Sequence, residues 1–95
     1  MMDREEAWII FKNKFSIGQS VSGKIIHKAP YGLFLDIGED FLCLLEIIEI
    51  KDLNYELYTA DQIFKAGEIV EGKVGDFTDS NKQMRITQRD RKNEN

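Results

Sequence analysis

The sequence predicts an all-β barrel of five short strands, preceded by one helix and interrupted by an irregular segment after the third strand. Ahead of Gly18, the aromatic residues Trp8, Phe11 and Phe15 recur at helical spacing. Beyond Gly18, short β-prone runs alternate with Gly, Asn and Asp residues that favour turns. Such a series of short strands is typical of a small barrel.

The expected helix covers residues 3–15. Asp3 and Glu6 have the spacing of a capping box, in which two side chains satisfy the first free backbone amides. The apolar face that carries Trp8 is expected to pack on the barrel, so that residues 1–17 form a helical lead-in to it. The alternative is that Trp8 binds a partner.

The strands follow from alternating apolar residues and from the residues that end each run. Pro30 ends the first strand because proline cannot donate a hydrogen bond to a sheet. Gly72 and Gly75 allow the fourth strand to coil around a corner of the barrel. Turns are expected at residues 38–40 and 79–82. The strands themselves are expected at residues 20–28, 32–37, 41–45, 68–77 and 83–87.

The connection between the third and fourth strands is long and irregular. It covers residues 47–64, with a short helix expected near residues 60–64. In OB folds this connection is the usual place for a helix. The order of elements therefore predicts a five-stranded OB-type β-barrel with an N-terminal helix.

The composition indicates one folded domain. The chain has 95 residues, of which 42% are apolar and 32% are charged. Its net charge of −4 differs from the positive balance of proteins that bind duplex DNA, but it is compatible with single-strand RNA binding by stacking. The acidic start of the chain differs from a signal peptide, and no apolar stretch is long enough to span a membrane. We expect a complete small protein that is monomeric and cytoplasmic, with no membrane partner.

No catalytic or metal site is expected. The single cysteine, Cys43, excludes a disulfide within the chain, and His27 is the one histidine, so no organised set of metal ligands is available. The sequence has no glycine loop that cradles phosphates and no nucleophile with a paired base. We therefore expect no cofactor and no enzymatic activity.

Four segments of the chain resemble the S1 RNA-binding domain family. The first strand region reads GQSVSGKI from Gly18, and the second reads YGLFLDIG from Tyr31. Further on, GEIV from Gly67 is followed by Lys73–Val74, and MRIT from Met84 is similar to the last strand of the family. The segments occur in the order that the family has.

The resemblance covers residues 18–89 and leaves residues 90–95 as a charged tail. S1 domains bind single-stranded RNA on one face of the barrel, so the resemblance implies that Tyr31 and Phe34 stack RNA bases. The alternative for Phe34 is a position partly in the core. The polar candidates for the RNA-binding face are Lys24, His27, Lys28, Glu46, Lys73, Gln83 and Arg85.

Two of these polar positions differ from the usual residues of the family. Glu46 stands where the family often has a histidine, and Gln83 stands where an arginine is common. The lysines and Arg85 among the candidates are expected to line a groove beside the aromatic pair. His27 is either a structural or solvated residue or a hydrogen-bond partner for a base or phosphate.

Two functions fit these features. The first is non-catalytic binding of single-stranded RNA in translation or RNA processing, with the ribosome or another RNA-processing protein as a further partner. The second is a protein-interaction module that binds a basic partner through the acidic residues 36–61, where eight acids accompany one lysine. The apolar part of that second contact would come from Leu53, Tyr55, Leu57 and Tyr58.

Overall fold

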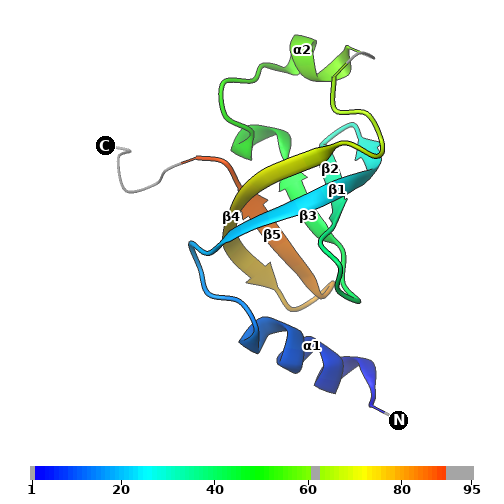
Figure 1. Cartoon of the computed structure of the whole chain (residues 1–95), viewed down its shortest axis with the longest axis vertical. Coiled ribbons are helices and arrows are strands. Elements are labelled where there is room, and N and C mark those ends of the chain that lie inside the picture. Colours follow the sequence, from blue (N-terminus) through cyan, green and yellow to red (C-terminus); the bar gives the residue numbers. More distant parts are fainter. Residues whose placement is uncertain (1, 61–62, 90–95) are drawn as a thin grey trace.

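The strands form a closed five-stranded barrel with a helix at either end (Figure 1). The computed structural model describes residues 2–60 and 63–89. The prediction of an OB-type β-barrel with an N-terminal helix and a helical connection after the third strand is confirmed. In chain order the elements are α1 (Arg4–Asn13), β1 (Ser20–Ala29), β2 (Gly32–Asp36), β3 (Cys43–Glu46), the 3-10 helix η1 (Ile47–Glu49), α2 (Tyr55–Thr59), β4 (Ile69–Thr78) and β5 (Gln83–Thr87).

Helix α1 covers one end of the barrel (Figure 1). It begins after Asp3, whose side chain accepts a hydrogen bond from the backbone amide of Glu6 at 2.8 Å. Trp8 is only 2% exposed, and its ring centroid lies 5.3 Å from that of Phe41 and 6.0 Å from that of Phe77. The interpretation of Trp8 as a docking residue for a partner is therefore wrong, because its ring is used to attach the helix to the barrel.

Strand β1 is long enough to pair on both sides of the barrel. Its first half is antiparallel to β4 and its second half is antiparallel to β2. The barrel closes through a short parallel pairing of β3 with β5, in which Cys43 lies opposite Met84 and Leu44 lies opposite Arg85. Strand β3 begins at Cys43 rather than at the predicted Phe41, because the pairing with β2 ends at Leu35 and Cys43.

Alternation along the strands separates a buried interior from the outer surface. Ile25, Leu33 and Met84 are fully buried. Strand β4 crosses very close to β5 at Gly72, where an added Cβ would lie 2.5 Å from Ile86 Cγ2. Only glycine fits this crossing, which agrees with the predicted role of Gly72 at a corner of the barrel.

The connection after β3 contains helix α2, which lies at the end of the molecule opposite α1 (Figure 1). The sequence predicts a helix near residues 60–64, whereas α2 begins earlier because Asn54 caps it. The Asn54 side chain accepts a hydrogen bond from the Leu57 amide at 2.8 Å. None of the helices in the described ranges is long and apolar enough to cross a membrane.

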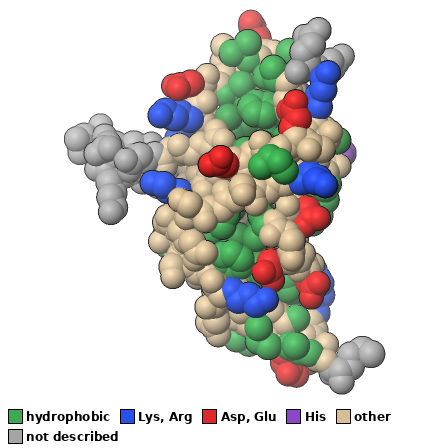
Figure 2. All heavy atoms as spheres, viewed as in Figure 1, with side chains coloured by type: hydrophobic (Ala, Val, Ile, Leu, Met, Phe, Trp, Pro, Cys, Tyr) green, Lys and Arg blue, Asp and Glu red, His purple; other side chains and the backbone are tan. Residues whose placement is uncertain are grey.

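Helix α2 is attached to the barrel through Tyr58. This residue is 2% exposed, and its hydroxyl donates a hydrogen bond to the carbonyl oxygen of Ala29. The expectation that Tyr58 forms part of an exposed apolar contact is therefore wrong. Tyr55 and Leu57 are exposed, and Figure 2 shows apolar side chains gathered at this end of the molecule.

Candidate nucleic-acid interface

Three ring side chains gather on the outer surface of the β1–β2 hairpin. We call His27, Tyr31 and Phe34 the aromatic platform. His27 lies opposite Phe34 in the strand pairing, with ring centroids 6.0 Å apart. Tyr31 lies at the hairpin turn with its centroid 6.0 Å from that of Phe34, and the two rings are nearly perpendicular at 84°. The platform therefore presents rings in more than one orientation within a small area.

The platform is accessible because of the alternation along β2. Leu33 and Leu35 point into the barrel and are buried, so Phe34 between them points outward. Phe34 is half-buried, while Tyr31 is 55% exposed. Gly32 joins the two ring positions and lets β2 pass close to β3, since a Cβ there would lie 2.6 Å from the carbonyl oxygen of Leu45.

The strand register continues the platform across the barrel. From β1 to β4 the residues opposite one another are His27, Phe34, Leu44, Arg85 and Asp76. Leu44 is 6% exposed and separates Phe34 from Arg85. Arg85 is therefore on the same outer surface as the aromatic platform, two strands away from Phe34.

Two carboxylates hold the guanidinium of Arg85. Its Nε and Nη2 donate to both carboxylate oxygens of Asp76 at 2.7 and 2.6 Å, and its Nη1 donates to Glu46 at 3.1 Å. The hydrogen bonds and charge of Asp76, with a smaller effect of Glu46, raise the pKa of Arg85 above its ordinary value. Arg85 therefore stays charged, but two acids compete with any phosphate for it.

Glu46 lies between Arg85 and the hairpin turn. It is opposite Gly32 in the β2–β3 pairing, next to Tyr31, and it is half-buried. A carboxylate is thus placed at the edge of the aromatic platform, where it repels an approaching phosphate.

Lys28 is turned toward the connection that contains α2. Its ammonium donates hydrogen bonds to the carbonyl oxygens of Ala60 at 3.0 Å and Ile63 at 2.9 Å. The same nitrogen lies 4.9 Å from the ring centroid of Tyr58. Lys28 therefore joins this connection to β1, whereas its neighbour His27 belongs to the aromatic platform.

The remaining polar candidates are spread around the barrel. Lys24 lies opposite Asp36, two residues beyond Phe34 on β2, and is exposed. Gln83 begins β5 and is paired with the end of β4, two residues before Arg85. Lys73 lies opposite Ser20 on β1 and Thr87 on β5, on a different side from the aromatic platform. The predicted lysines therefore do not form one groove beside the rings.

Sequence reasoning missed Asp76, the principal partner of Arg85. The signal was present in the β4–β5 hairpin, whose polar turn sets the register of the two strands. Counting back from Thr78, which lies opposite Gln83, brings Asp76 opposite Arg85. A β-bulge next to Val74 shifts the register beyond this pair.

Comparisons with known proteins agree with this fold. No family model matches the chain. The chain is 31% identical over 74 residues to small ribosomal subunit protein bS1 of Mycolicibacterium smegmatis, a match that covers 78% of the chain and 15% of that protein. The chain thus spans a small part of this ribosomal relative's length.

Two solved structures show the same barrel. GSP13 from Bacillus subtilis superposes with a TM-score of 0.65 and 20% identity, over 85% of this chain and 61% of that one. Mycoplasma genitalium RNase R, in complex with ribose-methylated single-stranded RNA, gives a TM-score of 0.64 and 21% identity over 84% of this chain and 14% of the enzyme. The strand order, the ribosomal match and these superpositions together identify the chain as an S1-like domain with an OB fold.

Proposed function

We propose that the chain binds single-stranded RNA without catalysis by stacking bases on Tyr31 and Phe34. The observation that carries the proposal is the exposed aromatic platform on the β1–β2 hairpin, with neighbouring centroids 6.0 Å apart. A base stacked on an aromatic ring contributes roughly 1–3 kcal/mol, whatever the base. Two such rings account for weak, sequence-tolerant binding.

The polar residues around the platform have secondary roles in this proposal. His27 donates a hydrogen bond to a base or phosphate of the RNA. Lys24, which lies on β1 opposite the end of β2, approaches the RNA backbone. Glu46 and Asp76 offset the charge of Arg85, so phosphate attraction on this surface is weak and stacking dominates. Lys28 and Gln83 support the surface from its edges.

The relatives favour a role in RNA metabolism. One is a protein of the small ribosomal subunit, and one is a ribonuclease solved with single-stranded RNA. We place the chain in the cytoplasm, acting as a monomer in translation or RNA processing.

The test is a pair of double variants compared in RNA titrations. Tyr31→Ala with Phe34→Ala removes both proposed stacking rings. Tyr55→Ala with Leu57→Ala is the matched control, because Tyr55 is 58% exposed, close to the 55% of Tyr31, but lies on α2. Fluorescence anisotropy with labelled oligo(U) and oligo(A) measures the affinity.

We expect the platform variant to lose at least about tenfold in affinity for both RNAs, since removing each stack costs roughly 1–3 kcal/mol. The α2 variant should bind like the parent. Equal binding by the platform variant and the parent would overturn the stacking proposal. Absence of RNA binding by the parent, even at low salt, would favour the protein-interaction alternative.

A further inference from the structure

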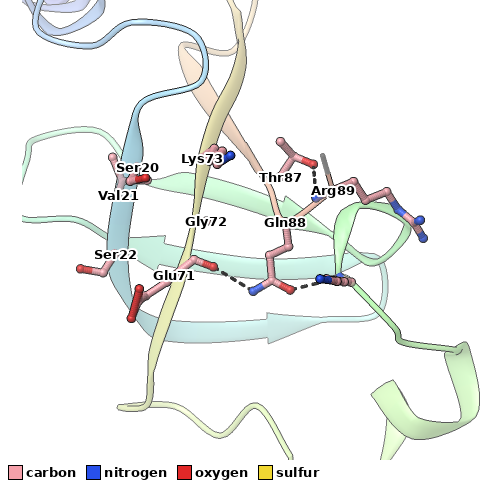
Figure 3. A pocket seen from close by; sticks show the side chains of 10 residues that line it. Ser20, Val21, Ser22, Glu71, Gly72, Lys73, Thr87, Gln88 and Arg89 are labelled. Carbon is pink, nitrogen blue, oxygen red and sulfur yellow. Dashed lines mark hydrogen bonds between the residues drawn. The ribbon is translucent and has the colours of Figure 1, made fainter. Parts of the chain in front are cut away.

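A second polar surface lies on the side of the barrel formed by the start of β1, the middle of β4 and the end of β5 (Figure 3). It is an open groove of about 590 Å³. Lys73, on this groove, pairs with Ser20, seven residues before His27 along β1. At the usual rise of a strand this separation is on the order of 20 Å. We call it the cationic groove, and among the polar residues that line it are Ser20, Ser22, Lys51, Lys73, Gln88 and Arg89.

Hydrogen bonds fix the backbone around the cationic groove. The Gln88 side chain donates to the carbonyl oxygen of Glu71 at 2.9 Å and accepts from the backbone amide of Lys51 at 3.1 Å (Figure 3). Arg89 is held by its Nε, which donates to the carbonyl oxygen of Ile48, and by its backbone amide, which donates to Thr87 Oγ1 at 3.0 Å. The segments that carry Lys51 and Arg89 are therefore positioned relative to β4.

The charges of this groove differ from those of the aromatic platform. Within residues 2–60 and 63–89, Lys51, Lys73 and Arg89 form no salt bridge, whereas Arg85 on the platform side is held by two acids. Within the described part of the chain, Glu71 is the one carboxylate among the lining residues. Among the described residues that line the groove there is no aromatic ring, so their chemistry suits an anion rather than a base.

We propose that the cationic groove binds phosphates of the same RNA strand whose bases stack on Tyr31 and Phe34, an inference that rests on the proposed function. The ammonium groups of Lys51 and Lys73 contact the phosphates, and the hydroxyls of Ser20 and Ser22 donate hydrogen bonds to them. The separation between the two surfaces means that only a longer strand reaches both. OB folds bind about 4–16 nucleotides, a range that includes RNAs too short to reach both surfaces and RNAs long enough to do so.

The test compares two lysine variants on short and long RNA. Lys51→Ala with Lys73→Ala removes two charges from the groove. Lys14→Ala with Lys65→Ala removes the same charge from exposed positions outside it. Both variants are titrated with oligo(U) of about 4 and about 12 nucleotides at several salt concentrations, after circular dichroism has verified the fold.

We expect the groove variant to bind the long strand about threefold to tenfold more weakly than the parent and the short strand equally well. The slope of log affinity against log salt should become shallower by about 0.7 for each phosphate that the variant no longer neutralises. The control variant should match the parent in its affinity for both strands and in its slope. Groove and control variants that share the same affinity and slope on the long strand would overturn the proposal.

The platform variant separates this inference from the proposed function. Tyr31→Ala with Phe34→Ala should lower the affinity for both the short and the long RNA. It should leave the slope of log affinity against log salt unchanged, because stacking releases no counterions. If that variant binds RNA like the parent while the groove variant binds the long RNA more weakly, the stacking proposal is wrong and phosphate binding by the cationic groove is supported. If the parent binds neither strand, both are overturned.

Discussion

The most informative residue-scale feature is the arrangement of Arg85 between Asp76 and Glu46. Asp76 makes the bidentate contact that fixes the guanidinium, and Glu46 adds a single longer bond at 3.1 Å. Side chains at these positions are 32–50% exposed, so solvent screens the pairs and each contributes little to stability. Their consequence is local, because the outer surface next to the aromatic platform carries more negative than positive charge.

This arrangement predicts that changing Glu46 strengthens RNA binding. Glu46→His removes the anion beside Tyr31, and Glu46→Gln removes the same charge while keeping the length of the side chain. Loss of one exposed like-charge repulsion is worth up to about 1 kcal/mol, so affinity should rise about twofold to fivefold in each variant. Asp76 still holds Arg85, so the fold of this surface should be unchanged.

Anisotropy titrations at low and high salt check this prediction. The gain should be largest at low salt, since screening weakens the removed repulsion. Unchanged affinity in both variants would show that Glu46 lies away from the bound RNA.

Residue identities predicted the aromatic platform better than they predicted its polar surroundings. The expectation for Tyr31 and Phe34 came from the resemblance to S1 domains. Leu33, Phe34 and Leu35 are all apolar, so the spacing alone left open whether Phe34 lies in the core. The contacts of Lys28 and Arg85 depend on groups far along the chain: the carbonyl of Ile63 in one case and Glu46 in the other. No local pattern contains those partners.

At the scale of elements, helix α1 is joined to the β4–β5 turn by a small polar cluster. The indole Nε1 of Trp8 and the ammonium of Lys12 both donate to the same carboxylate oxygen of Asp79 at 2.8 Å. The hydrogen bond from Lys12, followed by that from Trp8, lowers the pKa of Asp79 below its ordinary value of 3.8. Asp79 therefore favours the docked helix only while it is ionised.

The expected consequence is an acid-dependent contribution of Asp79 to stability. A carboxyl whose pKa is lower in the folded state stabilises the fold above its unfolded pKa, and this contribution is lost as pH falls through the folded value. Asp79→Asn should therefore be less stable than the parent at neutral pH. The difference should begin to shrink as the pH falls below the ordinary pKa of 3.8 and should disappear below the lowered pKa of the folded state. Asp40→Asn, at an exposed position, is the control.

Urea unfolding followed by tryptophan fluorescence, at pH about 6 and about 3, measures this contribution. A stability difference between Asp79→Asn and the parent that is the same at both pH values would contradict the account. RNA affinity should be unaffected, because α1 and the β1–β2 hairpin lie at different ends of the barrel (Figure 1).

The elements that were predicted well from the sequence are those in which the helical or alternating spacing of apolar residues is repeated over several residues. Helix α1 and strands β1, β4 and β5 follow this rule. The position of α2 was harder to predict, because a single cap at Asn54 decides where it begins and a buried Tyr58 decides how it packs. Phe41 looks like a strand residue in the sequence, but it precedes the first paired residue of β3 and packs against Trp8.

At the scale of the whole molecule, the proposed function requires an acidic chain to bind a polyanion. The net charge is −4, so long-range electrostatics does not draw RNA to the protein. Stacking on the aromatic platform is nearly independent of net charge, and the cationic groove confines the phosphate contacts to one side of the barrel. On this account affinity is modest, rises with RNA length and falls only moderately with salt.

The central claim is that RNA bases contact the rings of Tyr31 and Phe34. An NMR titration of the intact chain, with its aromatic side chains labelled, tests it directly by adding oligo(U) and oligo(A). The account predicts that the ring resonances of Tyr31 and Phe34 shift progressively with RNA, while those of Tyr55 on α2 and the buried Trp8 stay in place. Saturable binding that leaves the Tyr31 and Phe34 rings unshifted would contradict it.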